Sequence, residues 1–192
     1  LEYNLIVRTI ADIAESFGIG RFIGSWHVPP NIRVKFSVMA PDHMQRVRPS
    51  ERPHSDAWAG EHPEAITMHI PVFGDTDNNY VQLYEPPEFF EDDWLVPCNS
   101  TDPQVIYAYE GQHFPEYAPV RYVTPKGNVL FLDNAMLHAT HRNEMCGTRV
   151  SVEVPFLWKW AAQRPDLWRA NEHAPHKVLL KAGETHLFYF PD

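Results

Sequence analysis

The sequence predicts a mainly β fold, a β-sandwich or jelly roll with one N-terminal helix and few other helices. Two observations carry this prediction. First, the chain of 192 residues contains many short β-rich runs bounded by Gly, Pro, Asn or Asp, with few helical patterns between them. Second, aromatic residues make up 13% of the chain and 18 residues are proline, which suits strands joined by rigid turns better than a helical bundle.

The N-terminal segment is the clearest helix. In residues 5–17 apolar side chains recur at helical spacing, and Gly18 and Gly20 follow as stop signals. After it the pattern changes to strands. The expected strands are residues 32–39, 65–73, 80–84, 105–109, 128–132, 137–141 and 149–155. Residues 158–174 are expected to form a short helix or an ordered loop, and residues 177–190 one or two further strands.

Charge and cysteine usage exclude several classes of partner. The net charge is −9, so no nucleic-acid partner is expected, because no basic face could offset phosphate repulsion. No apolar run reaches the length of a membrane span and no signal peptide is visible. Cys98 and Cys146 lack the paired spacing of a disulfide framework or zinc knuckle, so a reducing, cytoplasmic setting is expected. Arg33 and Lys35 alternate on an early strand, where one of them could reach a bound carboxylate, but a solvated face is the expectation.

A first group of metal-ligand candidates is the run His54-Ser55-Asp56. In an extended segment, residues i and i+2 point to the same face, so an imidazole and a carboxylate there can bind one cation from the same side. The chain has 11 histidines, so this spacing alone is weak evidence for a metal site.

A second group lies within residues 127–155, which read as three consecutive strands with turns at residues 133–134 and near Gly147. His138 lies on the middle strand and Arg149 opens the last, so a hairpin would let both face one cavity. Ser151 shares the face of Arg149, and a guanidinium beside a hydroxyl suits a carboxylate. His141 competes with His138 as a ligand, but two residues three apart on a strand point to opposite faces.

Two histidines and one carboxylate form the facial triad of non-haem iron(II) oxygenases. Three protein ligands leave three octahedral positions open, which suits chemistry in which a bidentate co-substrate and dioxygen must both reach the metal. A closed zinc site would need a fourth ligand and would give no role to Arg149.

The order His-x-Asp, a distant His and Arg-x-Ser eleven residues later resembles the 2-oxoglutarate/iron(II)-dependent dioxygenases. The phytanoyl-CoA hydroxylase-like branch is the most similar, followed by oxygenases of bacterial carbohydrate gene clusters. The resemblance runs from about residue 33 to residue 156. It implies a cupin-like double-stranded β-helix and an enzyme that uses Fe(II), 2-oxoglutarate and O2 to hydroxylate a small-molecule substrate, such as a carbohydrate or related metabolite.

The resemblance assigns roles residue by residue. His54, Asp56 and His138 match the iron ligands, while Arg149 and Ser151 match the residues that bind the C5 carboxylate of 2-oxoglutarate.

Two further positions keep alternative roles. His69 lies on a strand where relatives place an aromatic residue near the co-substrate, so it is a candidate co-substrate contact or a core histidine. Trp58 follows the metal motif and either lines the substrate mouth or covers the edge of the core.

A single domain is expected over residues 1–192, with an N-terminal helix in residues 1–20, a catalytic core in residues 32–156 and a C-terminal extension in residues 157–192. The alternative function is a cupin-like protein without redox chemistry, either a metal-dependent sugar isomerase or a binding protein. Such a protein would need a metal site but no Arg-x-Ser pair.

Overall fold

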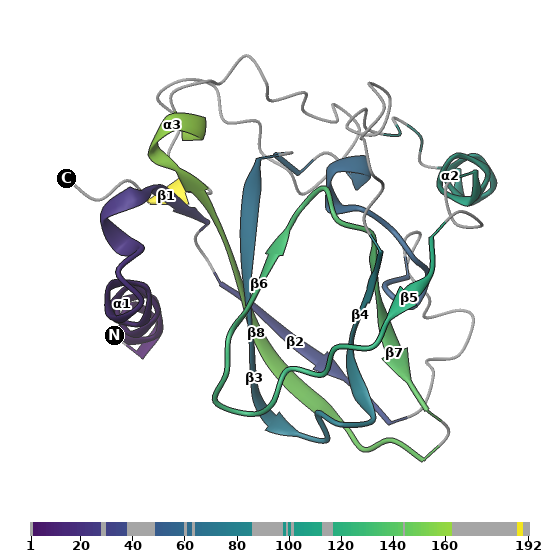
Figure 1. Cartoon of the computed structure of the whole chain (residues 1–192), viewed down its shortest axis with the longest axis horizontal. Helices are drawn as coiled ribbons and strands as arrows, with labels where there is room; N and C mark the ends of the chain where they lie inside the picture. The colour runs from purple at the N-terminus through teal and green to yellow at the C-terminus, as the bar shows by residue number, and fades with distance from the viewer. Residues whose placement is uncertain are drawn as a thin grey trace.

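Two antiparallel β-sheets form the framework of the computed structural model (Figure 1). The structure describes residues 2–27, 30–37, 49–59, 61–62, 64–85, 98, 100, 102–112, 117–143, 145–162 and 188–189. The larger sheet has the order β6 (Leu130–Asp133), β3 (Ala65–Gly74), β8 (Arg149–Trp158), β1 (Ile23–His27) and β9 (Phe188–Tyr189), and β2 (Asn31–Lys35) also pairs with β8. The smaller sheet has the order β5 (Pro119–Val120), β4 (Asn79–Tyr84) and β7 (His138–Arg142).

The described helices are few and short apart from the first. They are α1 (Glu2–Ser16), α2 (Pro103–Gly111), α3 (Lys159–Ala162) and the 3-10 turns η1 (Gly20–Phe22) and η3 (Asp56–Ala59). Within the described part of the chain, no helix combines the length and the apolar character that crossing a bilayer requires.

Most of the predicted elements are present. The helix of residues 5–17 is confirmed as α1, and the strand of residues 65–73 as β3. The strand predicted for residues 105–109 is wrong, because these residues lie in α2. This helix begins at Pro103, and the carboxylate of Asp102 caps it by accepting a hydrogen bond from the Gln104 amide at 2.9 Å. Strands β1 and β5 were not predicted. Of the segments predicted after β8, residues 163–187 lie outside the described residues.

Strand β8 is central to the larger sheet. It pairs with β3 from Ala65↔Leu157 to Gly74↔Arg149, and on its other edge with β2 and β1. Because successive side chains of a strand point to opposite faces, β8 presents a different chemistry on each side of the sheet. One face carries Val150, Val152, Val154 and Phe156, and the other carries Arg149, Ser151 and Glu153.

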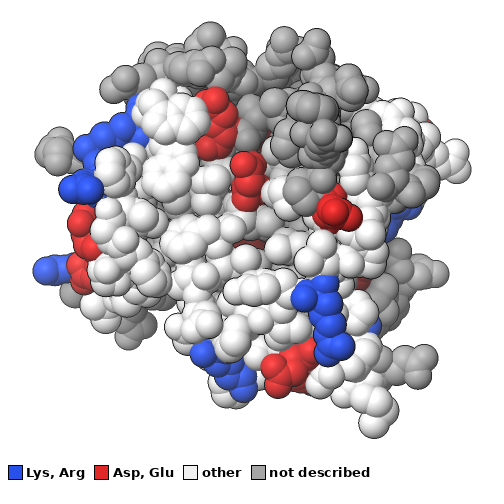
Figure 2. All heavy atoms as spheres, in the orientation of Figure 1, with Lys and Arg blue, Asp and Glu red and all other residues white. Residues whose placement is uncertain are grey.

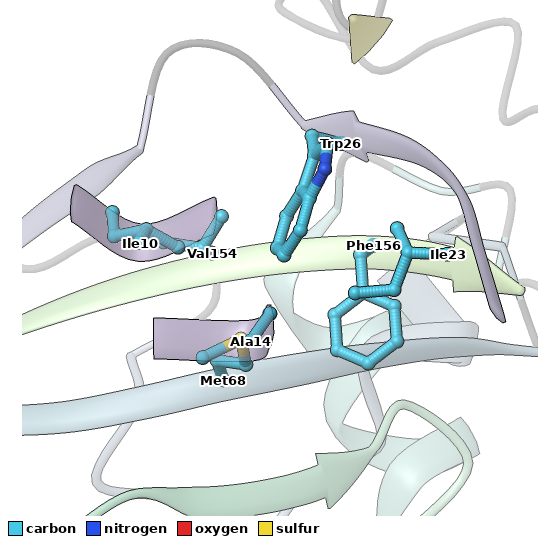
Figure 3. Close-up of a cluster of buried hydrophobic side chains, with 7 residues drawn as sticks. All are labelled: Ile10, Ala14, Ile23, Trp26, Met68, Val154 and Phe156. Carbon is cyan, nitrogen blue, oxygen red and sulfur yellow. The ribbon is translucent and has the colours of Figure 1, made fainter. Parts of the chain in front are cut away.

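The apolar face of β8 packs against helix α1. The buried cluster there joins α1, β1, β3 and β8 (Figure 3) and consists of Ile10, Ala14, Ile23, Trp26, Met68, Val154 and Phe156. Phe156 is fully buried, with its ring 5.5 Å from that of Trp26 and 4.8 Å from that of Trp158. The main hydrophobic core therefore lies on the side of the larger sheet away from β4, β5 and β7.

The opposite face of the larger sheet is polar. Residues directly opposite in antiparallel strands point to the same side, so Arg33 of β2 and His69 of β3 share the face of Ser151 and Glu153. This face meets the smaller sheet. The side chain of Asn79 on β4 donates to the carbonyl oxygen of Lys35 at 2.9 Å, which ties the two sheets together.

We expect Phe156→Ala to lower the free energy of unfolding by about 3–5 kcal/mol, because it removes a fully buried aromatic ring from the core beneath α1. The matched control is Phe73→Ala, since the Phe73 side chain is 72% exposed. Its effect should stay within about 0.5 kcal/mol. Urea denaturation of both variants measures the difference, and equal losses would contradict the placement of the core.

Candidate metal and carboxylate-binding site

Three possible metal ligands from distant parts of the chain converge. One ligand atom from each of His54, Asp56 and His138 lies within 4.8 Å of the other two. The Asp56 carboxylate oxygen Oδ1 is 3.8 Å from Nε2 of His54 and 3.9 Å from Nε2 of His138. The three groups are thus close enough for one cation to lie between them.

A two-residue backbone bridge brings the histidines together. The amide of His54 donates to the carbonyl of His138, and the amide of His138 donates to the carbonyl of His54, both at 2.9 Å. Asp56 is not in an extended segment, as the sequence suggested, but opens the turn η3. Ser55 is buried between them and donates to the carbonyl of Asn134 at 2.8 Å, which fixes this short loop.

The backbone also sets the orientation of both imidazole rings. Nδ1 of His54 is 2.7 Å from the Arg52 carbonyl, and Nδ1 of His138 is 3.0 Å from the Met136 carbonyl. A carbonyl oxygen only accepts hydrogen bonds, so each Nδ1 carries the hydrogen. In the neutral ring, Nε2 then presents its lone pair toward Asp56, as metal-binding histidines usually do.

His141 lies on the other face of β7. It is exposed, and its ring packs 4.8 Å from that of Tyr80, the residue opposite it on β4. Among the described residues, the group of possible metal ligands includes His138 and not His141.

Arg149 is a buried cation that lacks a hydrogen-bond partner for Nε. Its side chain is nearly inaccessible, and Nε meets no acceptor within the described residues. Burial lowers the pKa of Arg149 to about 10, Arg142 acts in the same direction and Glu153 opposes both, so the guanidinium stays charged at neutral pH. Ser151 is also fully buried, and its hydroxyl oxygen lacks a partner in the described part of the chain. A bound carboxylate would satisfy both groups.

The route by which Arg149 reaches the interior differs from the prediction. β7 and β8 do not form the predicted hairpin, because they belong to different sheets. Their inward-facing side chains lie instead in the interior between the two sheets. The start of β8 lies close to β3 at Gly74, whose φ is 93°. A Cβ there would collide with the carbonyl of Thr148, so this close approach requires glycine.

His69 is buried on the same face of the larger sheet as Arg149 and Ser151. Neither of its ring nitrogens has a hydrogen-bond partner among the residues described. Burial lowers the pKa of His69 to about 4, and although Glu153 opposes this shift, Arg149 and His138 add to it. His69 is therefore neutral at physiological pH and has one donor and one acceptor available.

The structure reveals a polar pair that the sequence did not single out. Nε of Arg33 lies 2.7 Å from the Glu153 carboxylate, so Arg33 points to the interior of the fold and not to a fully solvated face. Burial alone would lower the pKa of Arg33, but the attraction of the Glu153 carboxylate outweighs burial, so the pKa of Arg33 is raised. Burial likewise raises the pKa of Glu153, yet Arg33 lowers it below the ordinary value. The alternation of Arg149, Ser151 and Glu153 along one strand is the sequence feature that could have indicated that Glu153 faces the interior.

Trp58 lies in the interior beside the metal motif. It is fully buried with Ala135 and Leu137, and its ring meets that of Tyr109 edge-on at 6.1 Å. The indole thus connects the loop of Asp56 to α2. A contact between Trp58 and a substrate stays a prediction.

Comparison with known proteins identifies the fold. No protein-family model matches the chain, and no curated protein matches it. Among solved structures, the non-haem α-ketoglutarate-dependent epimerase SnoN from nogalamycin biosynthesis matches 79% of this chain and 55% of its own, with 14% identity and a TM-score of 0.50. AviO1 from Streptomyces viridochromogenes Tue57 has 14% identity, 77% and 56% coverage and a TM-score of 0.42. An N-substituted L-amino acid dioxygenase from Burkholderia ambifaria AMMD has 13% identity, 67% and 52% coverage and a TM-score of 0.41.

The chain spans about half the length of each of these proteins. The likeness to SnoN is one of fold, since 14% of the residues are identical. This chain therefore has the fold of a non-haem α-ketoglutarate-dependent epimerase.

Proposed function

We propose that this chain is an Fe(II)- and 2-oxoglutarate-dependent oxygenase that hydroxylates a small-molecule substrate. The observation that carries the proposal is the buried pair of Arg149 and Ser151, each with an unpartnered polar atom, in the same interior as three convergent metal-ligand candidates. A metal site without redox chemistry gives no reason for a buried guanidinium that has no hydrogen-bonded acid within the described residues.

The strand order supports a cupin-like double-stranded β-helix. One sheet contains β2, β8, β3 and β6, and the other contains β5, β4, β7 and the bridge at His54. These eight segments, four in each of two facing layers with crossovers between them, match the arrangement of a jelly roll, and β1 and β9 extend the larger sheet beyond it.

The proposed metal ligands fit iron(II). Two imidazoles and one carboxylate are the donor set of the facial triad, and both rings are held with Nε2 directed toward Asp56. When bound, iron(II) supplies the oxidative chemistry, in which 2-oxoglutarate, O2 and a substrate C–H bond yield succinate, carbon dioxide and the hydroxylated product.

The residues of the chain bind and orient the reactants. Arg149 and Ser151 hold the C5 carboxylate of 2-oxoglutarate, which replaces the hydrogen bonds that both side chains lack. His69, neutral and buried on the same face of the sheet as this pair, provides one further hydrogen bond to the co-substrate. Fixing the co-substrate in this way accelerates the reaction by removing its freedom to rotate.

The surface supports a small-molecule substrate. Among the described residues on the face shown in Figure 2, Lys and Arg side chains are interspersed with Asp and Glu side chains and form no continuous basic patch. A carbohydrate or a related metabolite is the proposed substrate. Cys98 and Cys146 are buried free thiols, in keeping with the proposed cytoplasmic location.

The deciding experiment is the addition of 2-oxoglutarate to the anaerobic Fe(II)-loaded protein. A weak visible charge-transfer band should appear, and succinate should form once O2 is admitted. A redox-silent metal-dependent isomerase or binding protein would show neither signal.

Asp56→Ala should abolish the coupled formation of succinate, because the proposed metal site loses its only anionic ligand. The protein should still fold, since the core beneath α1 does not include this residue. Succinate assays and circular dichroism measure the two effects. Unchanged succinate formation would remove Asp56 from the metal site.

His138→Ala and His141→Ala form a matched pair on one strand. The first should lose iron(II) binding, while the second should retain it, because the His141 ring lies on the outer face against Tyr80. Iron content after desalting gives the comparison. The reverse result would show that His141 is the ligand.

Arg149→Ala should weaken 2-oxoglutarate binding by roughly ten- to a hundred-fold, since a hydrogen bond to a charged group contributes about 1.5–3 kcal/mol. Iron affinity should change little, because the guanidinium is not a ligand. Lysine at this position should restore binding only in part, since it keeps the charge but loses the planar fork. Titration of 2-oxoglutarate into the anaerobic iron-loaded variants decides the matter, and equal binding curves would count against the carboxylate site.

A further inference from the structure

The ion pair of Arg33 and Glu153 leaves several of its hydrogen-bonding groups without partners among the described residues. Nε of Arg33 donates to Oε2 of Glu153 at 2.7 Å, and this is the one hydrogen bond that either side chain makes within the described residues. The two Nη groups of Arg33 and Oε1 of Glu153 remain available. The side chains are 36% and 19% exposed, so a ligand can reach them.

The pair lies beside the proposed metal site. Arg33 is close enough to Asp56 and Glu61 for both to raise its pKa, and Glu153 interacts with His69 and His138. On the sheet, Arg33 is opposite Ser151 and Glu153 is opposite His69, so the pair shares the inner face that carries the proposed co-substrate residues. The pair therefore lies on the same inner face as the proposed co-substrate residues and within electrostatic range of the proposed metal ligands.

An ion pair in this position needs more than its own attraction to be stabilising. Taking two charges out of water costs several kcal/mol per ion, which is offset only when their remaining donors and acceptors are also satisfied. Here three groups lack such partners among the described residues. A ligand that supplies both acceptors and donors would complete the pair.

Charge balance selects the kind of ligand. Arg33 and Glu153 cancel each other, the cation of Arg149 on the same face offsets the carboxylate of Glu61, and Asp56 is a ligand of the proposed metal. Neither an anion nor a cation would therefore meet an excess of opposite charge at the pair. A neutral hydroxyl group can accept from a guanidinium N–H and donate to a carboxylate oxygen at the same time.

We propose that Arg33 and Glu153 together bind neighbouring hydroxyl groups of a neutral polyol or sugar, and so set the substrate class of the enzyme. This inference rests on the proposed function, because it places the substrate beside the iron and 2-oxoglutarate sites. Glu153 holds the guanidinium of Arg33 in position, and the free groups of both side chains contact the substrate.

Saturation-transfer NMR on protein loaded with Zn(II) and 2-oxoglutarate tests the proposal without turnover. The probes are methyl glucoside, glucuronate and glucosamine, which differ mainly in charge. Methyl glucoside should bind the most tightly. The paired variant Arg33→Met, Glu153→Gln removes both charges of the ion pair together, so neither is left buried without the other, and it should weaken methyl glucoside binding by roughly ten- to a hundred-fold. Each single variant should weaken it too.

Arg21→Met is the matched control, because Arg21 is an exposed arginine that stacks on Phe22 at 4.6 Å, away from the interior. Its probe affinities should equal those of the wild type. Tighter binding of glucuronate or glucosamine, no binding of methyl glucoside, or unchanged binding in the paired variant would each overturn the proposal. The 2-oxoglutarate signals of the same samples report on the proposed function separately: if they show no binding, the oxygenase proposal fails as well.

Discussion

The pairing of β8 on both of its edges is the constraint on which the other features depend. Hydrogen bonds to β3 on one side and to β1 and β2 on the other leave the strand no freedom to slip, because a shift by one residue would exchange its two faces. In the observed register, Val154 and Phe156 enter the core beneath α1, while Arg149 and Ser151 enter the interior. The same backbone bonds thus stabilise the fold and place a cation where a carboxylate can be bound.

This arrangement concentrates polar groups where most folds of this size place their core. The described interior between the sheets holds Arg149, Ser151, His69, Arg33 and Glu153, and the largest apolar cluster lies outside it under α1. Burying polar groups without partners costs free energy, so the helix-covered core must offset that cost. Separating the two roles lets the interior be adapted to ligands without weakening the main hydrophobic cluster.

Periodicity and spacing made much of the fold predictable. The helix α1 and the long strands β3 and β8 could be predicted because each carries a sustained apolar pattern. Helix α2 was misread because Val105, Ile106 and Tyr107 favour strands, whereas the cap at Asp102 and Pro103 favours a helix. The triad candidates followed from local spacing and a family resemblance. Arg33 and Glu153 are separated by 120 positions, and only the register of β2 with β8 shows that they meet.

The bridge between His54 and His138 also has a consequence for how this chain acquires a metal. These two residues come from opposite halves of the sequence, so the backbone hydrogen bonds between them close a long loop. Closing such a loop costs conformational entropy, which contacts elsewhere in the fold must offset. An unfolded chain therefore keeps His54 and Asp56 near each other but does not hold His138 beside them. A tightly held ion would therefore mark molecules that have completed folding, and would slow their unfolding afterwards.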